Sequence, residues 1–234
     1  MKKTRYALTL SLFCLGATLL LAKDPEASVK PGINEGFLDP NLIVEDWLGR
    51  FEIESREVYH CQDEIVTLLD IERGMTVADI GAGTGLYLKP FAEAVGDGGK
   101  LYAVDISEVF IKHLQMRSEK QGLKQVETIL GAEDAVRLPD SSIDLAFICD
   151  TYHHFEYPKN SLASILNALK PGGRLALIDF ERIPEVSREW TMGHVRAGKD
   201  VFTKEIETAG FEKVKELTLA GFKENYFIIF RKPK

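Results

Sequence analysis

The sequence predicts an α/β protein with a doubly wound, mostly parallel sheet and helices on both of its faces. From Met75 onward, short runs rich in Val, Ile, Leu and Phe alternate with segments whose apolar residues recur at helical spacing. The runs are almost continuously apolar, as expected for strands that are buried on both faces. A glycine-rich segment follows the first run, which in such folds is the place of a ligand site.

Seven apolar runs are predicted to form the strands. They span residues 76–81, 100–106, 126–131, 143–150, 174–180, 211–220 and 226–231. No helical segment separates the last two runs, so we expect them to form an antiparallel hairpin. Ahead of the first strand, apolar residues recur at helical spacing from Phe51 to Leu69, which predicts a helix. We place the main domain at residues 51–234.

The first 22 residues differ from the rest of the chain. Lys2, Lys3 and Arg5 precede an uncharged apolar run that ends at Ala22, a pattern typical of a secretory signal peptide. The run is close to the minimum length for spanning a bilayer, so an uncleaved N-terminal anchor is the alternative. The positive residues before the run predict that the domain is exported to the periplasm or the extracellular space.

Residues 23–50 are rich in Pro, Gly and Asn, and are predicted to form a linker and N-terminal extension with a short amphipathic piece at its end. The formal net charge of the chain is −7. Such an acidic protein is a poor nucleic-acid binder, because phosphate contacts need clustered Lys and Arg. Cys61 and Cys149 lie far apart without ligand-like spacing, so we predict no metal site and a buried free thiol at Cys149.

The glycine loop "DIGAGTGLY", residues 79–87, follows the first predicted strand. The dinucleotide fingerprint G-x-G-x-x-G fits Gly81 and Gly83, but Leu86 stands at its third position. Asp79, two residues before the first glycine, would repel a diphosphate and attract a cationic ligand. The loop therefore favours a ligand such as S-adenosylmethionine, which carries a sulfonium and an ammonium group but no phosphate.

Further carboxylates follow the second and third strands. Asp105 can accept hydrogen bonds from ribose hydroxyls, although an Asp before a helix is also a common helix cap. Glu133 and Asp134 can accept from an adenine amino group, or can be solvated loop charges. Acidic residues at three successive strand ends favour a ligand over three independent structural roles.

At this point the chain resembles a known family. The segments "VADIGAGTG", "LYAVDIS", "GAEDAVRLPDSSIDLAFICD" and "LKPGGRLALIDF" look like successive motifs of the class I S-adenosylmethionine-dependent methyltransferases, in particular the small-molecule group called type 11. The resemblance covers about residues 50 to 232. It implies a Rossmann-like seven-stranded methyltransferase fold, S-adenosylmethionine as cofactor and a small-molecule acceptor, and it leaves the acceptor itself and the oligomeric state open.

The resemblance also implies cofactor contacts at each strand end. They are Asp79, Gly81, Ala82, Gly83 and Gly85 for the methionine side, Asp105 and Ile106 for ribose and adenine, Glu133, Asp134 and Ala135 for adenine, and Cys149 or Asp150 near the sulfur.

The segment "CDTYHHFEYP" follows the fourth strand, where the transferred methyl group is expected to emerge. His153 or His154 can act as a base if the acceptor has to lose a proton. Tyr152 can orient the acceptor or contact the sulfonium. The alternative is that the histidines brace the next helix, and because adjacent side chains diverge we expect at most one of them to face the site.

A second acceptor-side candidate is "WTMGHVRAGK", in which Trp190, Met192 and His194 would form an apolar wall with one polar group. The alternative for each of these three side chains is ordinary surface packing. The segment after the fourth strand also lacks the Asn/Asp-Pro-Pro-Tyr pattern of methylases that act on amino groups of nucleobases or glutamine, which further disfavours nucleic acid.

Two other functions compete with methyl transfer. A nicotinamide-dependent oxidoreductase is disfavoured by Leu86 and Asp79 in the glycine loop. An exported methyltransferase-like binding module without turnover is favoured by the leader, because S-adenosylmethionine is made in the cytosol. The joint presence of Asp79, Asp105 and Asp134 favours the enzyme, since a domain that no longer binds the cofactor has no physical need for them.

Overall fold

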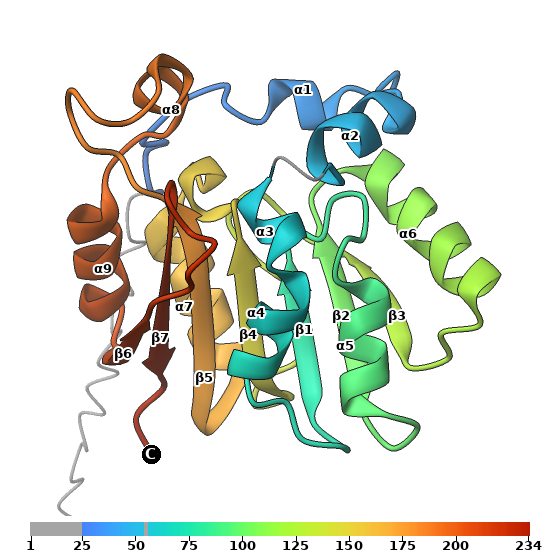
Figure 1. Cartoon of the computed structure of the whole chain (residues 1–234). Coiled ribbons are helices and arrows are strands. Elements are labelled where there is room, and N and C mark those ends of the chain that lie inside the picture. Colours follow the sequence, from blue (N-terminus) through green and yellow to red (C-terminus); the bar gives the residue numbers. More distant parts are fainter. Residues whose placement is uncertain (1–24, 54–55) are drawn as a thin grey trace, which may run out of the picture.

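The structure is a computed structural model that describes residues 25–53 and 56–234 (Figure 1). The predicted signal peptide, residues 1–22, lies outside the described residues. None of the helices in these two ranges combines the length and the apolar character that crossing a bilayer requires.

The seven predicted strands form one sheet in the order β3-β2-β1-β4-β5-β7-β6. The strands are β1 (Thr76–Ile80), β2 (Lys100–Asp105), β3 (Val126–Leu130), β4 (Ile143–Cys149), β5 (Leu169–Phe180), β6 (Glu212–Leu217) and β7 (Asn225–Arg231). β1 to β5 pair in parallel, whereas β7 lies antiparallel between β5 and β6. The predicted fold and its antiparallel final pair are confirmed.

Helices cover both faces of the sheet. The described helices are α1 (Glu35–Leu38), α2 (Val44–Phe51), α3 (Glu57–His60), α4 (Gln62–Leu68), α5 (Leu88–Val95), α6 (Glu108–Gln121), the 3₁₀ turn η1 (Tyr152–His154), α7 (Pro158–Ala168), α8 (Glu189–His194) and α9 (Lys199–Thr208). Side chains alternate between the two faces along β1: Val77 belongs to the core on the side of α4, α5 and α6, and Ala78 to the core on the side of α7 and α9. This double-sided burial explains the continuous apolar runs.

The helix predicted from Phe51 to Leu69 is broken in the structure. α2 ends at Phe51, and α3 and α4 meet at Cys61, whose backbone leaves the helical conformation. The apolar spacing had two origins: Val58 and Ile65 are buried in the core, whereas Phe51 lines a cavity. One periodic pattern therefore covered separate elements with different partners.

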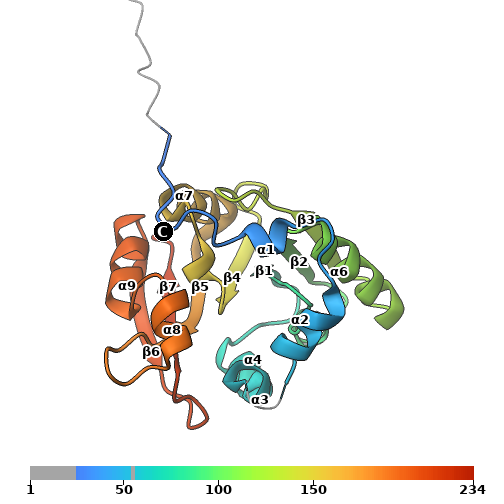
Figure 2. The same ribbon diagram turned by 90° about the horizontal axis from the view of Figure 1, so that it is seen from above.

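The segment predicted as a linker folds over the carboxyl edge of the sheet. α1 and α2 lie across the top of the molecule in Figure 1, and Figure 2 shows them with α3 and α8 around the strand ends. The amide of Val29 donates to the carbonyl of Glu156 over 2.9 Å, and the Asn34 side chain donates to the carbonyl of His154 over 3.0 Å. Residues 25–50 are therefore part of the folded domain rather than a linker.

Candidate active site

A cavity of about 1060 Å³ lies at the carboxyl edge of the parallel strands. Its walls come from the loops after β1, β2, β3 and β4, from the segment that carries α1 and α2, and from α8. The strand-end loops form one end of the cavity, which we call the cofactor end. Residues of η1, α8 and the end of β5 form the other, which we call the acceptor end.

The backbone of the glycine loop lies against the cavity, and no residue larger than glycine fits at two positions of the loop. Gly81 has φ +76°, and a Cβ atom at this position would collide with the side chain of Thr151. Gly85 has φ +87°, and its Cβ would lie 2.7 Å from Leu88 Cδ1. Both positions combine a left-handed backbone with a close approach, which only glycine accommodates without strain. Gly81, Ala82 and Gly83 line the cavity, whereas Gly85 does not, because the space beside it is filled by the core residues Leu88 and Leu114. The structure therefore does not bring the predicted Gly85 contact to the cavity.

Asp79 is a buried carboxylate with an unsatisfied atom. Its side chain is at the end of β1, the residue is 3% exposed, and it lines the cavity. Oδ2 has no hydrogen-bond partner. Burial, together with the neighbouring charge of Asp105, raises the pKa of Asp79 to about 7. A cationic group in the cavity would satisfy this oxygen, so the site fits a ligand with an ammonium group.

Asp105 lies opposite the glycine loop at the end of β2. One of its oxygens accepts from the amide of Gly83 and the other from the amide of Ser107, each over 2.9 Å. Burial raises its pKa to about 6, and these hydrogen bonds oppose the shift. The N-cap of α6 is Ser107, whose hydroxyl accepts from Phe110, so Asp105 is not the cap. The carboxylate keeps acceptor capacity for a hydroxyl donor in the cavity.

The loops after β2 and β3 bring most, but not all, of the remaining predicted cofactor contacts to the cavity. Ile106, Glu133 and Ala135 line the cavity. Asp134 is exposed and is not among the lining residues. The reason is a tight turn closed by the bridge between Ala132 and Ala135, at whose tip neighbouring side chains point apart. The structure therefore does not bring the predicted Asp134 contact to the cavity.

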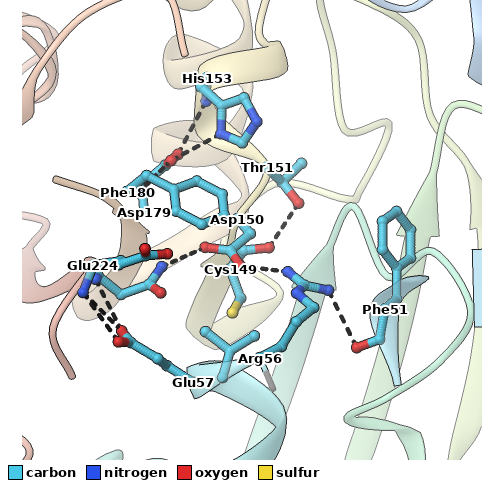
Figure 3. A network of polar contacts seen from close by, with 12 residues as sticks. Phe51, Arg56, Glu57, Cys149, Asp150, Thr151, His153, Asp179, Phe180 and Glu224 are labelled. Atoms are coloured by element: carbon cyan, nitrogen blue, oxygen red, sulfur yellow. Dashed lines mark hydrogen bonds and ion pairs between the residues drawn. The ribbon is translucent and has the colours of Figure 1, made fainter. Parts of the chain in front are cut away.

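At the end of β4, Cys149 and Asp150 line the cavity, and Figure 3 shows how Asp150 is held. Arg56 forms an ion pair with one oxygen of Asp150, and Asn225 donates to the other over 2.6 Å. Burial raises the pKa of Asp150, while Arg56 opposes this shift. Asp150 adopts φ +48°, a strained backbone that this network stabilises. Its carboxylate is thus occupied by protein partners.

Glu57 extends this network to the far edge of the sheet. Its carboxylate accepts from the backbone amides of Lys223, Glu224 and Asn225 (Figure 3). This anchors α3 to the β6–β7 loop and closes one side of the cavity. Glu57 was not predicted as a site residue, because the segment around it carries no motif that marks it.

His153 lies at the acceptor end with its ring orientation fixed by Asp179 (Figure 3). Nδ1 of His153 is 2.8 Å from Asp179 Oδ1, and the amide of His153 donates to Oδ2 over 3.0 Å. Asp179, near the end of β5, is fully buried. A carboxylate against Nδ1 selects the tautomer that carries the proton there, which leaves Nε2 as an acceptor. Asp179 was not predicted as a site residue, since its partner is distant in sequence.

His154 and His194 also line the cavity and face each other. Their Nε2 atoms are 3.1 Å apart. Burial lowers the pKa of His154 to about 2 and that of His194 to about 4, and the proximity of His153 contributes to both shifts. Both rings are therefore neutral near pH 7. The expectation that at most one of His153 and His154 faces the site is wrong, because successive side chains of a 3₁₀ turn are about 120° apart and two of three can border a wide cavity.

Tyr152 takes the third direction, away from the cavity. It is fully buried against Phe155 and Phe202, and its hydroxyl donates to Glu205 over 2.8 Å. It is absent from the cavity lining. The prediction that Tyr152 orients the acceptor or contacts the sulfonium is wrong, because the ring is a core residue of the α9 side of the sheet.

Aromatic side chains complete the acceptor end and the wall that the segment with α1 and α2 forms. Trp190 stacks on His194 with ring centroids 4.7 Å apart and lines the cavity, whereas Met192 does not line it. Phe37 and Trp47, with centroids 4.7 Å apart, come from the segment predicted as a linker. This wall was not predicted, because nothing in the residue spacing of that segment marks a cavity.

Comparisons with known proteins agree with this geometry. Residues 78–177 match the family model described as a methyltransferase domain. The ubiquinone/menaquinone biosynthesis C-methyltransferase UbiE of Escherichia fergusonii is 31% identical over 113 residues, which are 48% of this chain and 45% of that protein. The chain thus matches less than half of the length of this relative.

Solved structures share the fold. A SAM-dependent methyltransferase from Aquifex aeolicus is 25% identical, with a TM-score of 0.69 over 80% of this chain and 97% of its own. The [4+2]-cyclase SpnF is 15% identical with a TM-score of 0.68 over 89% of this chain and 97% of its own, a likeness of fold alone. Residues 78–177 thus match a methyltransferase domain, the chain shares the fold of S-adenosylmethionine-dependent methyltransferases, and these comparisons imply S-adenosylmethionine as the cofactor.

Proposed function

We propose that the protein transfers a methyl group from S-adenosylmethionine to a small, ring-bearing acceptor. The observation that carries this proposal is the pairing of two ends in one cavity. One end presents the unpartnered carboxylate oxygen of Asp79, and the other presents neutral histidines between aromatic walls. A cavity of about 1060 Å³ is at the upper limit of single-ligand sites, and so is large enough for two small molecules side by side.

The residues of the cofactor end have separate roles in binding. Asp79 attracts the α-ammonium group, Asp105 accepts from the ribose hydroxyls, and the loop at Gly81 lets backbone approach the ligand. When bound, S-adenosylmethionine supplies an electrophilic methyl group on a sulfonium. Because methyl transfer is an in-line displacement, the contribution of these residues is to hold the ligand in one orientation.

The residues of the acceptor end hold and activate the nucleophile. Phe180 and Trp190 offer flat apolar surface to a ring, with centroids 5.5 Å apart. His153 is held by Asp179 with Nε2 free to accept, so it can take the proton of an acceptor hydroxyl and leave an oxyanion or its ring carbon as the nucleophile. Asp179 is a positioning residue, since it acts through His153.

The similarity to a C-methyltransferase of quinone biosynthesis supports a ring acceptor. That protein is a C-methyltransferase of ubiquinone and menaquinone biosynthesis. We extend to this chain only the chemical class, a small ring that carries an acidic hydroxyl and is methylated on carbon. The aromatic walls and the neutral bases fit this class better than they fit a nucleic acid, and the net charge of −7 opposes phosphate backbones.

We also propose that the domain is exported, on the basis of the leader pattern in residues 1–22. Export would separate the enzyme from cytosolic S-adenosylmethionine, so it requires an external supply of the cofactor. A reporter fused after residue 40 tests this directly. Activity on the outer side of the membrane supports export, and activity only on the cytoplasmic side contradicts it.

Calorimetric titration of the full chain tests the proposed function. We expect micromolar binding of S-adenosylmethionine and S-adenosylhomocysteine, and no binding of NADH. Asp105→Ala should weaken the binding of both ligands at least tenfold, whereas Asp134→Asn should leave it unchanged. A folded chain that binds none of the three ligands would contradict methyl transfer and favour a binding module. After cofactor binding, a screen of phenols and quinols with labelled methyl groups identifies the acceptor.

A further inference from the structure

Three of the five histidines of the chain meet at the acceptor end of the cavity. His153 and His154 come from η1, and His194 comes from the end of α8, 40 residues further along the chain. One ligand nitrogen from each ring can be chosen so that all three lie within 4.8 Å of one another. We propose that these residues, which we call the histidine triad, form a binding site for a divalent transition metal ion of the zinc type.

The spacing of two of the nitrogens is already that of a metal site. At metal–nitrogen distances of about 2.0–2.1 Å, tetrahedral ligands are about 3.3 Å apart. The Nε2 atoms of His154 and His194 are 3.1 Å apart. The third ligand atom has to approach by about 1.5 Å to complete that geometry, a displacement within the range of side-chain adjustment on binding.

The contact between His153 and Asp179 is a second, independent indication. A histidine that binds metal through one nitrogen usually donates its other N–H to a carboxylate, which fixes the ring and increases its basicity. Nδ1 of His153 lies 2.8 Å from the fully buried Asp179, so Nε2 is the atom left for a metal. The negative charge of Asp179 also compensates part of the charge of a divalent cation in this buried place.

The charges around the triad bear on metal binding, because imidazole ligands must be neutral. One neighbouring cation, the ammonium group of Lys30, opposes metal binding by charge repulsion. Lys30 donates to the carbonyl oxygens of Gly193 and His194, so its ammonium group points at backbone rather than at the ring nitrogens. Imidazole nitrogens suit Zn, Cu, Fe and Ni, and three protein ligands with an open position facing a cavity are typical of catalytic rather than structural sites.

A metal in this place would change how the acceptor is activated, a consequence that rests on the proposed function. The open position faces the cavity, where an acceptor oxygen can coordinate. A coordinated hydroxyl releases its proton more readily, so the metal would replace His153 as the source of activation. Turnover that falls on chelation and returns with Zn²⁺ would indicate the metal, and turnover that is unaffected by chelators would indicate His153 as a base.

Metal binding is tested on the full chain without cofactor or acceptor. The chain is first treated with a chelator and then titrated with Zn²⁺ against a chromophoric chelator, and with Co²⁺ by visible absorption. We expect one equivalent to bind. His194→Gln should weaken binding at least tenfold, and Asp179→Asn by about 10–100-fold. His113→Gln is the matched control and should bind as the wild type does, since His113 contacts the carbonyl of Thr84 outside the triad.

A measurement on the wild-type chain tests metal binding without relying on the folding of any variant. Zn²⁺ should shift the imidazole ¹⁵N resonances of the histidine triad and leave those of His60 and His113 in place. The proposal is overturned if Zn²⁺ shows no saturable binding, or if it shifts His60 or His113 rather than the triad. Binding of S-adenosylhomocysteine to the same metal-free sample is a separate result, so loss of the metal site leaves the proposed function intact.

Discussion

The two ends of the cavity differ in how the chain builds them. The cofactor end consists of loops that each directly follow a parallel strand, such as the loop from Asp79 to Gly85. The acceptor end gathers η1, α8 and the end of β5, which are separated by stretches of sequence. The cofactor end therefore follows from the local succession of strand and loop, whereas the acceptor end depends on tertiary contacts.

The largest expected effect is at the most constrained position of the cofactor end. Gly81→Ala should abolish cofactor binding and destabilise the fold by about 2 kcal/mol or more, because φ is +76° and the new Cβ collides with Thr151. Gly98→Ala is the control, since a Cβ added there would meet no atom within 4 Å. Thermal unfolding and calorimetry measure both. Wild-type affinity in Gly81→Ala would show that the loop is not rigid.

Replacement of Asp79 by Asn should weaken cofactor binding and increase the stability of the ligand-free protein. Its pKa rises from 3.8 to about 7 in the folded protein, so the folded state loses stability as pH increases from about 4 to 7 and the buried carboxyl ionises. Asp79→Asn should therefore stabilise the ligand-free protein at pH 8 by a few kcal/mol, at 1.36 kcal/mol per pKa unit. Unfolding curves at pH 5 and 8 measure this. An equal effect at both values would contradict the raised pKa.

The same titration predicts the pH dependence of cofactor affinity. Below pH 7 the neutral form of Asp79 predominates in the free protein and no longer attracts an ammonium group. The dissociation constant of S-adenosylhomocysteine should therefore increase by up to about tenfold per pH unit below 7. Calorimetry from pH 5.5 to 8 measures the profile, and a flat profile would exclude an ionised Asp79 in binding.

At the acceptor end, Asp179→Asn should separate turnover from cofactor binding. Loss of the negative charge beside His153 Nδ1 disturbs the tautomer and orientation of the ring. Turnover should fall by about 10–100-fold, while the affinity for S-adenosylhomocysteine stays within about twofold of wild type. Measurements of kcat and KM for the acceptor, once identified, check this. Equal losses in turnover and in cofactor affinity would show that the two ends are not independent.

The smallest functional effect is expected at Tyr152, the residue that the structure removes from the site. Tyr152→Phe should leave cofactor affinity and turnover unchanged and cost about 1 kcal/mol of stability, because the hydroxyl donates to Glu205 far from the cavity. Chemical denaturation and activity assays measure the two quantities. A large loss of activity without loss of stability would show that Tyr152 acts at the acceptor end.

The sequence predicted the fold and most of the cofactor end because both follow from local patterns. Apolar runs mark strands, and a strand that ends in a loop with Asp79 or Asp105 places that carboxylate at the edge of the sheet. The exceptions are Gly85, which lies against core side chains, and Asp134, whose direction depends on a turn closed by backbone pairing. A residue type at a strand end thus predicts location, but not the direction of its side chain.

The acceptor end could be predicted only in part. The pair His153 and His154 was found because it directly follows a strand. Asp179 and the wall formed by Phe37 were missed, since they meet the pair through folding and not through spacing in the sequence. The apolar residues of the first helices were read as one periodic pattern, although they face both the core and the cavity.

Asp79 is expected to bind the amino-acid end of the cofactor, and a calorimetric comparison of two ligands tests this role. S-adenosylhomocysteine carries the ammonium group, whereas 5′-methylthioadenosine keeps the nucleoside and lacks that end. At pH 8 we predict that the wild-type chain prefers S-adenosylhomocysteine by at least tenfold, and that this preference disappears in Asp79→Asn while methylthioadenosine binds equally to both. An unchanged preference in Asp79→Asn would contradict the account.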